Sequence, residues 1–169
     1  MCETSTNHVF SPFLPLPPIF FSTQVEHTYA IFEAGYGIMN EHQLAMGEST
    51  CAARFWAAPP VGGGKARMEV REMSKIALER CKTARCAIHL MGGLAEQYGY
   101  YSADWSGGDN SKGEGGEALT VIDPEEAWVF HILSDDTGTS AVWAAQRVPD
   151  DHVSTRKDTC SSFSHLTNL

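Results

Sequence analysis

The sequence predicts a single domain of the α+β class, in which helices lie against antiparallel sheet. Period-two patterns of apolar residues occur before residue 51 and again after residue 117, as in strands that bury one face. Between them, apolar residues recur every three or four positions from Met68 to Gly99, which is typical of amphipathic helices. A length of 169 residues, 43% of them hydrophobic, suits one core better than two.

Residues 1–23 form a proline-rich lead for which we expect no regular structure. Pro12, Pro15, Pro17 and Pro18 interrupt an apolar run, and proline continues neither a helix nor a central strand. No basic residue precedes this run, which is also too short and broken to cross a membrane, so it is a poor signal peptide and a poor membrane helix. The compartment therefore stays unknown, with the cytoplasm as the default.

The stretch Gly35–Cys51 predicts a β-hairpin, and the alternation in residues 24–32 predicts a strand that leads into it. Apolar runs at 36–39 and 44–46 flank a polar turn at 40–43. We expect this hairpin to form the floor of a site.

Side chains that can take part in chemistry gather at the hairpin tip and beyond its second strand. Asn40, Glu41 and His42 occupy the turn, whereas Glu48 and Ser49 come where we expect the second strand to end. Strand ends can hold reactive groups and still expose them. Hairpin tips are polar in any soluble protein, however, so the pattern alone favours an ordinary solvated turn over a functional site.

Two helices are predicted between Met68 and Gly99, joined near Cys81-Lys82. Thr83 suits the N-cap of the second helix, and Gly99 suits its end. The pair Gly92-Gly93 lies inside the second helix. Each glycine there costs about 1 kcal/mol relative to alanine, unless a neighbour packs closely against it.

Two stretches rich in glycine or proline predict connections. Residues 52–65 contain Pro59-Pro60 and three consecutive glycines, which favour a flexible crossover. A phosphate-binding loop is disfavoured there, because Lys65 is followed by alanine rather than by serine or threonine. Residues 100–116 are glycine-rich and long enough to be a lid or a bridge.

The last third of the sequence predicts an antiparallel meander of three strands at 118–122, 127–133 and 140–148. Residues 123–126 form a turn with proline at its favoured second position, and residues 134–139 form the next turn. The middle strand is apolar on both faces, as expected of a central strand.

Charge and cysteine usage exclude several classes of function. The net charge is -9 and the pI about 5.1, so we expect no partner among nucleic acids and no membrane association. Five cysteines, an odd number without Cys-x-x-Cys spacing, support neither a disulfide framework nor a zinc ribbon. We interpret Cys51, Cys81 and Cys86 as core-packing residues. No ligand spacing calls for a metal, and we expect no cofactor.

Four segments, in the same order along the chain, resemble the dipeptidase A and secernin family. They are Tyr36–Cys51 (YGIMNEHQLAMGESTC), Ala77–Arg85 (ALERCKTAR), Gly116–Phe130 (GEALTVIDPEEAWVF) and Ser140–Ser154 (SAVWAAQRVPDDHVS). The likeness covers about Gln24 to Thr155. It divides the chain into the lead at 1–23, a family domain at 24–155 and a divergent tail at 156–169.

The resemblance implies an N-terminal-nucleophile hydrolase with an αββα sandwich. In such enzymes an N-terminal cysteine attacks the peptide bond of a dipeptide or short peptide, and the α-amino group serves as the base. Asn40 and Ser49 are then expected as polar pocket or oxyanion groups, and Glu48 as a partner for the substrate amine. The whole expected substrate pocket consists of Asn40, Glu41, His42, Glu48, Ser49 and Arg147.

The sequence also departs from the family at both ends. Cys2 is the candidate nucleophile because removal of Met1 would make it N-terminal, but the expected strand does not follow it. The family's nucleophile segment is not recognisable before Gln24, and its oxyanion asparagine is absent after Thr155. We therefore expect an incomplete sandwich and a dipeptidase fragment of doubtful activity.

The alternatives are a non-catalytic scaffold or a peptide-binding or interaction protein of the same fold, or an unrelated domain that binds small molecules. The expected partner is a dipeptide or short peptide substrate, and the sequence leaves the formation of a homo-oligomer open.

Overall fold

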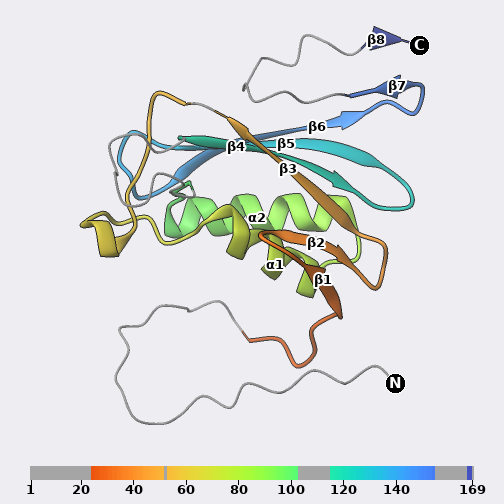
Figure 1. Ribbon diagram of the computed structural model, residues 1–169, viewed down its shortest axis with the longest axis horizontal. Helices are drawn as coiled ribbons and strands as arrows, with labels where there is room; N and C mark the ends of the chain where they lie inside the picture. The colour runs from red at the N-terminus through yellow and green to blue at the C-terminus, as the bar shows by residue number, and fades with distance from the viewer. Residues whose placement is uncertain (1–23, 52, 103–114, 155–166, 169) are drawn as a thin grey trace.

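Two helices pack against one face of a six-stranded antiparallel sheet (Figure 1). The computed structural model describes residues 24–51, 53–102, 115–154 and 167–168. The six strands lie side by side in chain order, from β1 to β6. The structure therefore confirms a mixed α+β fold, with one helical layer and one large sheet among the residues it describes.

The strands of the large sheet are β1 (Ile31–Glu33), β2 (Gly37–Asn40), β3 (Ala45–Cys51), β4 (Gly116–Ile122), β5 (Ala127–Ser134) and β6 (Ala141–Val148). A second sheet pairs β7 (His152–Val153) with β8 (Thr167–Asn168). The predicted meander of β4, β5 and β6 is confirmed, with strand bounds within two residues of those expected. The predicted lid at 100–116 falls mostly outside the described residues.

Two predictions about the first strands are wrong. The strand expected at 24–32 is restricted to β1. Further upstream, Tyr29 donates its N–H to the carbonyl of Glu79 at 2.9 Å, so the chain turns there toward the end of α1. Conversely, β3 does not end before Glu48. It pairs with β4 as far as Cys51, so the polar residues after the hairpin lie within a strand.

The helices α1 (Val70–Arg80) and α2 (Ala84–Tyr98) occur where the periodicity predicts them. Thr83 caps α2 by accepting a hydrogen bond from the N–H of Cys86 at 3.3 Å. Gly99 ends α2 with a φ of 74°, a left-handed value that glycine adopts readily. Both caps were predicted from local residue type.

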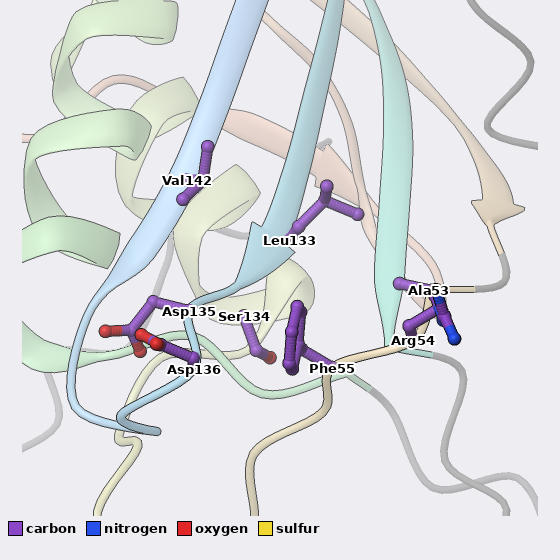
Figure 2. A pocket seen from close by; sticks show the side chains of 8 residues that line it. All are labelled: Ala53, Arg54, Phe55, Leu133, Ser134, Asp135, Asp136 and Val142. Carbon is purple, nitrogen blue, oxygen red and sulfur yellow. The ribbon is translucent and has the colours of Figure 1, made fainter.

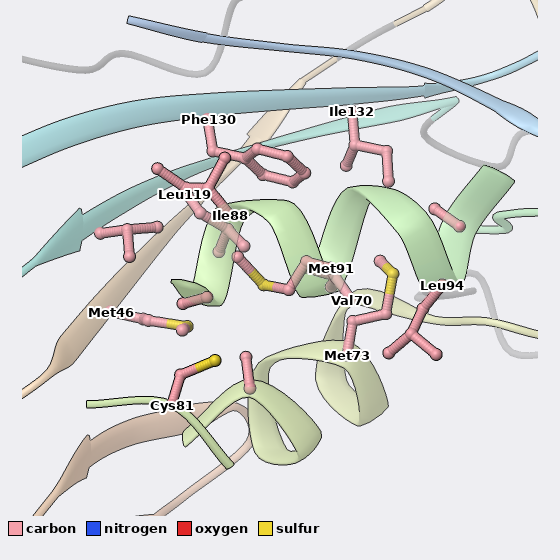
Figure 3. Close-up of a cluster of buried hydrophobic side chains, with 14 of the residues drawn as sticks. Met46, Val70, Met73, Cys81, Ile88, Met91, Leu94, Leu119, Phe130 and Ile132 are labelled. Atoms are coloured by element: carbon pink, nitrogen blue, oxygen red, sulfur yellow. The ribbon is translucent and has the colours of Figure 1, made fainter. Parts of the chain in front are cut away.

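The core lies between the helices and the sheet (Figure 3). Met46, Leu119 and Phe130 extend from the sheet toward Met91 and Met73 on the helices. α1 packs mainly on β1 and β2, while α2 packs on β4, β5 and β6. Complete burial of one such side chain contributes about 1.5–3 kcal/mol, so the packing of the helices on the sheet stabilises the fold.

Trp143 on β6 lies across α2 at Gly92. A Cβ added to Gly92 would be 2.3 Å from Cε2 of Trp143, whereas a Cβ on Gly93 would meet nothing within 4 Å. The indole N–H of Trp143 donates to Oε1 of Glu96 at 2.8 Å. The two glycines, although adjacent, therefore have different roles, because only Gly92 makes room for a neighbour.

Asp123 connects the β4–β5 turn to the start of α2. Its carboxylate accepts from the N–H of Ala84 at 2.7 Å, from that of Glu125 at 2.8 Å and from that of Glu126 at 2.9 Å. Burial opposes ionisation of Asp123, but these backbone donors, together with Arg85, outweigh it and lower the pKa of the carboxyl group.

Cys81 and Cys86 form a disulfide across the link between α1 and α2. Cys81 follows α1 in an extended conformation, which brings its Cα to 5.6 Å from that of Cys86, a usual separation for a disulfide. Cys81 is buried and Cys86 is exposed. The interpretation of these two residues as separate core-packing thiols is therefore wrong.

Replacing Gly92 and Gly93 singly by alanine should shift stability in opposite directions. Gly92→Ala should destabilise the protein by about 1–3 kcal/mol, because Trp143 must move. Gly93→Ala is the matched control and should stabilise α2 by up to about 1 kcal/mol. Thermal unfolding of both variants measures the difference, and an equal shift for the two would contradict the packing of Trp143 on Gly92.

Asp123→Ala should destabilise the protein by about 1–2 kcal/mol near neutral pH. Since the pKa of Asp123 is lower in the folded chain than in the unfolded chain, its ionised form stabilises the fold above the unfolded-state pKa of about 4. That contribution is lost as the pH falls through the lower, folded-state pKa. Chemical denaturation near pH 7 and near pH 3 should show the difference between wild type and variant shrinking in acid.

Glu125→Ala is the control for this experiment, because the side chain of Glu125 is exposed in the same turn. Equal destabilisation by the two substitutions would rule out a specific role for the Asp123 carboxylate.

The disulfide predicts a particular peptide in a digest made without reduction. Trypsin cleaves after Arg80, Lys82 and Arg85, so the dipeptide Cys81-Lys82 should be recovered attached to the peptide that begins with Cys86. Mass spectrometry before and after reduction detects the pair. Recovery of both peptides separately, each alkylated before any reductant is added, would show that the two thiols are free.

Candidate functional site

A pocket lies at the end of the large sheet where β5 ends and β6 begins (Figure 2). Its volume is about 520 Å³, which falls in the range of about 300–1,000 Å³ typical of small-molecule sites. The lining residues are Ala53, Arg54, Phe55, Leu133, Ser134, Asp135, Asp136 and Val142.

The floor of the pocket belongs to the sheet face that the helices leave uncovered. Leu133 on β5 and Val142 on β6 are cross-strand partners. Their neighbours Ile132 and Trp143 face the helices, so alternation turns Leu133 and Val142 to the other side. Val142 and Phe55 are each 59% exposed. The site therefore offers apolar surface that described residues do not cover.

Two glycines let the chain after β3 approach the sheet. A Cβ on Gly115 would lie 2.1 Å from the carbonyl oxygen of Phe55, and a Cβ on Gly116 would lie 2.4 Å from Cδ2 of Leu133. Because neither glycine carries a side chain, the backbone of Phe55 can lie against the start of β4. This glycine pair, which closes a stretch predicted to be a loop, sets one wall of the pocket.

Charges of opposite sign lie on two sides of the pocket. In Figure 2 Arg54 stands on one side of Phe55, and Asp135 and Asp136 stand on the other. Asp135 is engaged in the β5–β6 turn, where its carboxylate accepts from the hydroxyl of Thr137 and from the N–H of Ser140. The hydrogen bond from Thr137 is the largest cause of the lowered pKa of Asp135.

Arg54 and Asp136 are not engaged in this way. Both residues are exposed, and among the residues that the structure describes neither has an ion pair or a side-chain hydrogen bond. Counting only residues that the structure describes, the pocket thus carries one available cation and one available anion beside an apolar floor.

Asn40, expected to line a substrate pocket, joins the hairpin to α1 instead. It is 5% exposed. Its Nδ2 donates to the carbonyls of Leu78 and Cys81, both at 2.8 Å. Its Oδ1 accepts from the N–H groups of His42 at 3.0 Å and Leu44 at 3.1 Å. The two donors and two lone pairs of the amide are all used within the fold.

Glu41 and His42 lie at the same hairpin tip. Glu41 is exposed, and its Oε1 accepts from the N–H of Ala30 at 3.1 Å. The ring of His42 packs edge-on against Tyr29, with 4.4 Å between ring centroids. Both residues close the hairpin onto the segment before β1.

Glu48 and Ser49 are adjacent on β3 and therefore point to opposite faces of the sheet. Glu48 lies on the helix side, where its Oε1 accepts from the hydroxyl of Thr50 at 3.1 Å. Burial, with a smaller contribution from Glu48, raises the pKa of the nearby Tyr36 to about 12. Ser49 lies on the open face, the one that carries the pocket floor.

Arg147 lies toward the opposite end of β6 from the pocket. Its Nη2 is 2.6 Å from Oδ1 of Asp150, and its Nε is 3.4 Å from Oε2 of Glu126. At about 3.4 Å per residue, Arg147 is roughly 17 Å along the strand from Val142. It does not border the pocket.

The structure therefore gathers Asn40, Glu41 and His42 at one end of the molecule and places Ser49 alone on the face of the pocket. Cys2 lies outside the described residues. Within the described part of the chain, no group of three or more His, Cys, Asp or Glu side chains is placed to hold a metal ion. No helix in that part is long and apolar enough to cross a membrane.

The sequence model of peptidase family C69 matches residues 22–162, a span that contains the hairpin, both helices and the meander. The chain belongs to peptidase family C69. This membership agrees with the resemblance to the dipeptidase A and secernin family, and it assigns the chain to a family of peptidases. No solved structure gives a significant match.

Little in the sequence of this C69 chain singles out Arg54, Phe55 and Asp136. The prolines and glycines of residues 52–65 indicated a flexible connector, and Asp136 lay in what was predicted to be an ordinary turn. The one local signal was the aromatic pair Phe55-Trp56 beside an arginine. Only the folded chain shows that these segments meet.

Proposed function

We propose that this C69 chain is a cysteine-type dipeptidase, which hydrolyses the peptide bond of dipeptides or other short peptides. The observation that carries the proposal is the family match over residues 22–162. A peptidase of small substrates needs a pocket of limited size, and the pocket at the end of β5, about 520 Å³ in volume, meets that requirement.

The proposed fold is the αββα sandwich of N-terminal-nucleophile hydrolases, of which α1, α2 and the large sheet would form one half. The support comes from the sheet face away from the helices. Ile122 lies on that face and is 40% exposed, and a second sheet packed there would bury its side chain.

In the proposed mechanism the thiolate of Cys2 attacks the carbonyl carbon of the scissile bond. The amine product leaves with a proton, and water then hydrolyses the thioester and restores the thiol. The α-amino group of Cys2 would act as the base, because its unperturbed pKa of about 8 is close to neutral pH. Removal of Met1 is required first, since the free amino group must belong to Cys2.

The test is hydrolysis of a dipeptide panel by the purified chain, with intact mass recorded to establish that Met1 is absent. We expect release of free amino acids by wild type and a loss of at least about a hundredfold in Cys2→Ala, because the nucleophile is gone. Glu125→Gln is the control, since its side chain is exposed in the β4–β5 turn and the substitution leaves every cysteine in place. Unchanged turnover in Cys2→Ala would remove Cys2 as the nucleophile.

A second candidate is a non-catalytic peptide-binding protein of the same fold. One observation favours it: the matched region begins at residue 22, so Cys2 lies outside it. A folded sample with Met1 removed that binds short peptides but does not cleave them would support this candidate against the dipeptidase.

A further inference from the structure

We propose that the pocket between Arg54 and Asp136 binds a short peptide by both of its free ends. The peptide carboxylate pairs with Arg54, the peptide ammonium pairs with Asp136, and a large apolar side chain covers the floor. The inference rests on the proposed function for the choice of a peptide as ligand, but it does not depend on cleavage.

The charges of the pocket suit a zwitterion. Arg54 and Asp136 line one pocket from different sides (Figure 2), and within the described residues each lacks an ionic partner. A zwitterion satisfies both charges at once. A dianion such as a phosphate ester would find a single arginine and two carboxylates, which is an unfavourable match.

An apolar surface lies between these charges. Leu133, Val142 and Phe55 present it, and exposure of 59% for both Val142 and Phe55 shows that it is not buried against other described residues. Covering it with a leucine or phenylalanine side chain is favourable. The pocket is thus expected to prefer dipeptides with large apolar residues over Gly-Gly.

The acidic side of the pocket is held in place by hydrogen bonds. Asp135 fixes the β5–β6 turn through its hydrogen bonds with Thr137 and Ser140, and Asp136 follows it directly. Asp135 is therefore a positioning residue, while Asp136 has a carboxylate that is available to a ligand.

The test measures binding by calorimetry with the full chain carrying Cys2→Ala, so that no ligand is consumed. The ligands are Leu-Phe, N-acetyl-Leu-Phe, Leu-Phe-amide and Gly-Gly. We expect Leu-Phe to bind about five- to tenfold more tightly than either blocked derivative, because each block removes one charge-assisted contact at a partly exposed site. Gly-Gly should bind at least about tenfold more weakly than Leu-Phe.

The two charge variants should each lose one specific discrimination. Arg54→Ala should bind Leu-Phe and Leu-Phe-amide equally, while it still prefers Leu-Phe over the acetylated form. Asp136→Asn should bind Leu-Phe and N-acetyl-Leu-Phe equally, while it still prefers Leu-Phe over Leu-Phe-amide. A variant that merely failed to fold would lose all binding and would not retain one preference.

Matched controls exist at the other end of the molecule. Lys82→Ala and Glu125→Gln remove charges of the same signs from exposed positions in the α1–α2 link and the β4–β5 turn. Both should leave the four affinities unchanged.

Equal affinity for all four ligands, or no detectable binding, would overturn the inference. The inference would also be overturned if the Arg54→Ala and Asp136→Asn variants kept the wild-type ligand preferences. This holds even if the chain hydrolyses dipeptides. A third outcome is that the expected binding pattern is found but the chain that retains Cys2 hydrolyses no dipeptide. That outcome would support the inference and contradict the proposed function.

Discussion

The amide of Asn40 connects the hairpin to the helical layer, and the position of β3 depends on it. Its four hydrogen bonds reach the turn backbone on one side and, on the other, the carbonyl of Leu78 in the last turn of α1 and that of Cys81 just after the helix. Carbonyls at a helix end have no partner within the helix, and leaving a buried one unpaired costs about 1–3 kcal/mol. Since β4 pairs with β3, and β3 begins directly after the turn that Asn40 closes, this side chain connects the sheet to the end of α1.

At the two ends of the sheet, the polar side chains differ in how many hydrogen bonds and ion pairs they form within the chain. At the hairpin end, Asp123 and Arg147 and their partners are linked by hydrogen bonds and ion pairs within the chain. At the end where β5 finishes, Arg54 and Asp136 lie beside apolar surface without such partners among the described residues. Side chains that stabilise the fold are thus separated from those that remain available to a ligand.

Local residue chemistry was enough to predict much of the fold. Thr83 and Gly99 mark the ends of α2 through contacts made within the helix, and the alternation in the last third gave the meander. The functions of Asn40 and of Cys81 with Cys86 could not be predicted, because they depend on where α1 ends in space. The pocket was also beyond prediction, since Phe55 and Asp136 come from segments that meet only through β3, β4 and β5.

The order of the strands has a consequence for how quickly the chain can fold. β4, β5 and β6 are joined by short turns, and so are β2 and β3, whereas pairing β3 with β4 must close the span of residues 52–115, which includes both helices. Closing a span of that length costs roughly 2–3 kcal/mol more chain entropy than closing a four-residue turn. Two locally formed halves should therefore assemble first, and their joining along the β3–β4 seam should limit the folding rate.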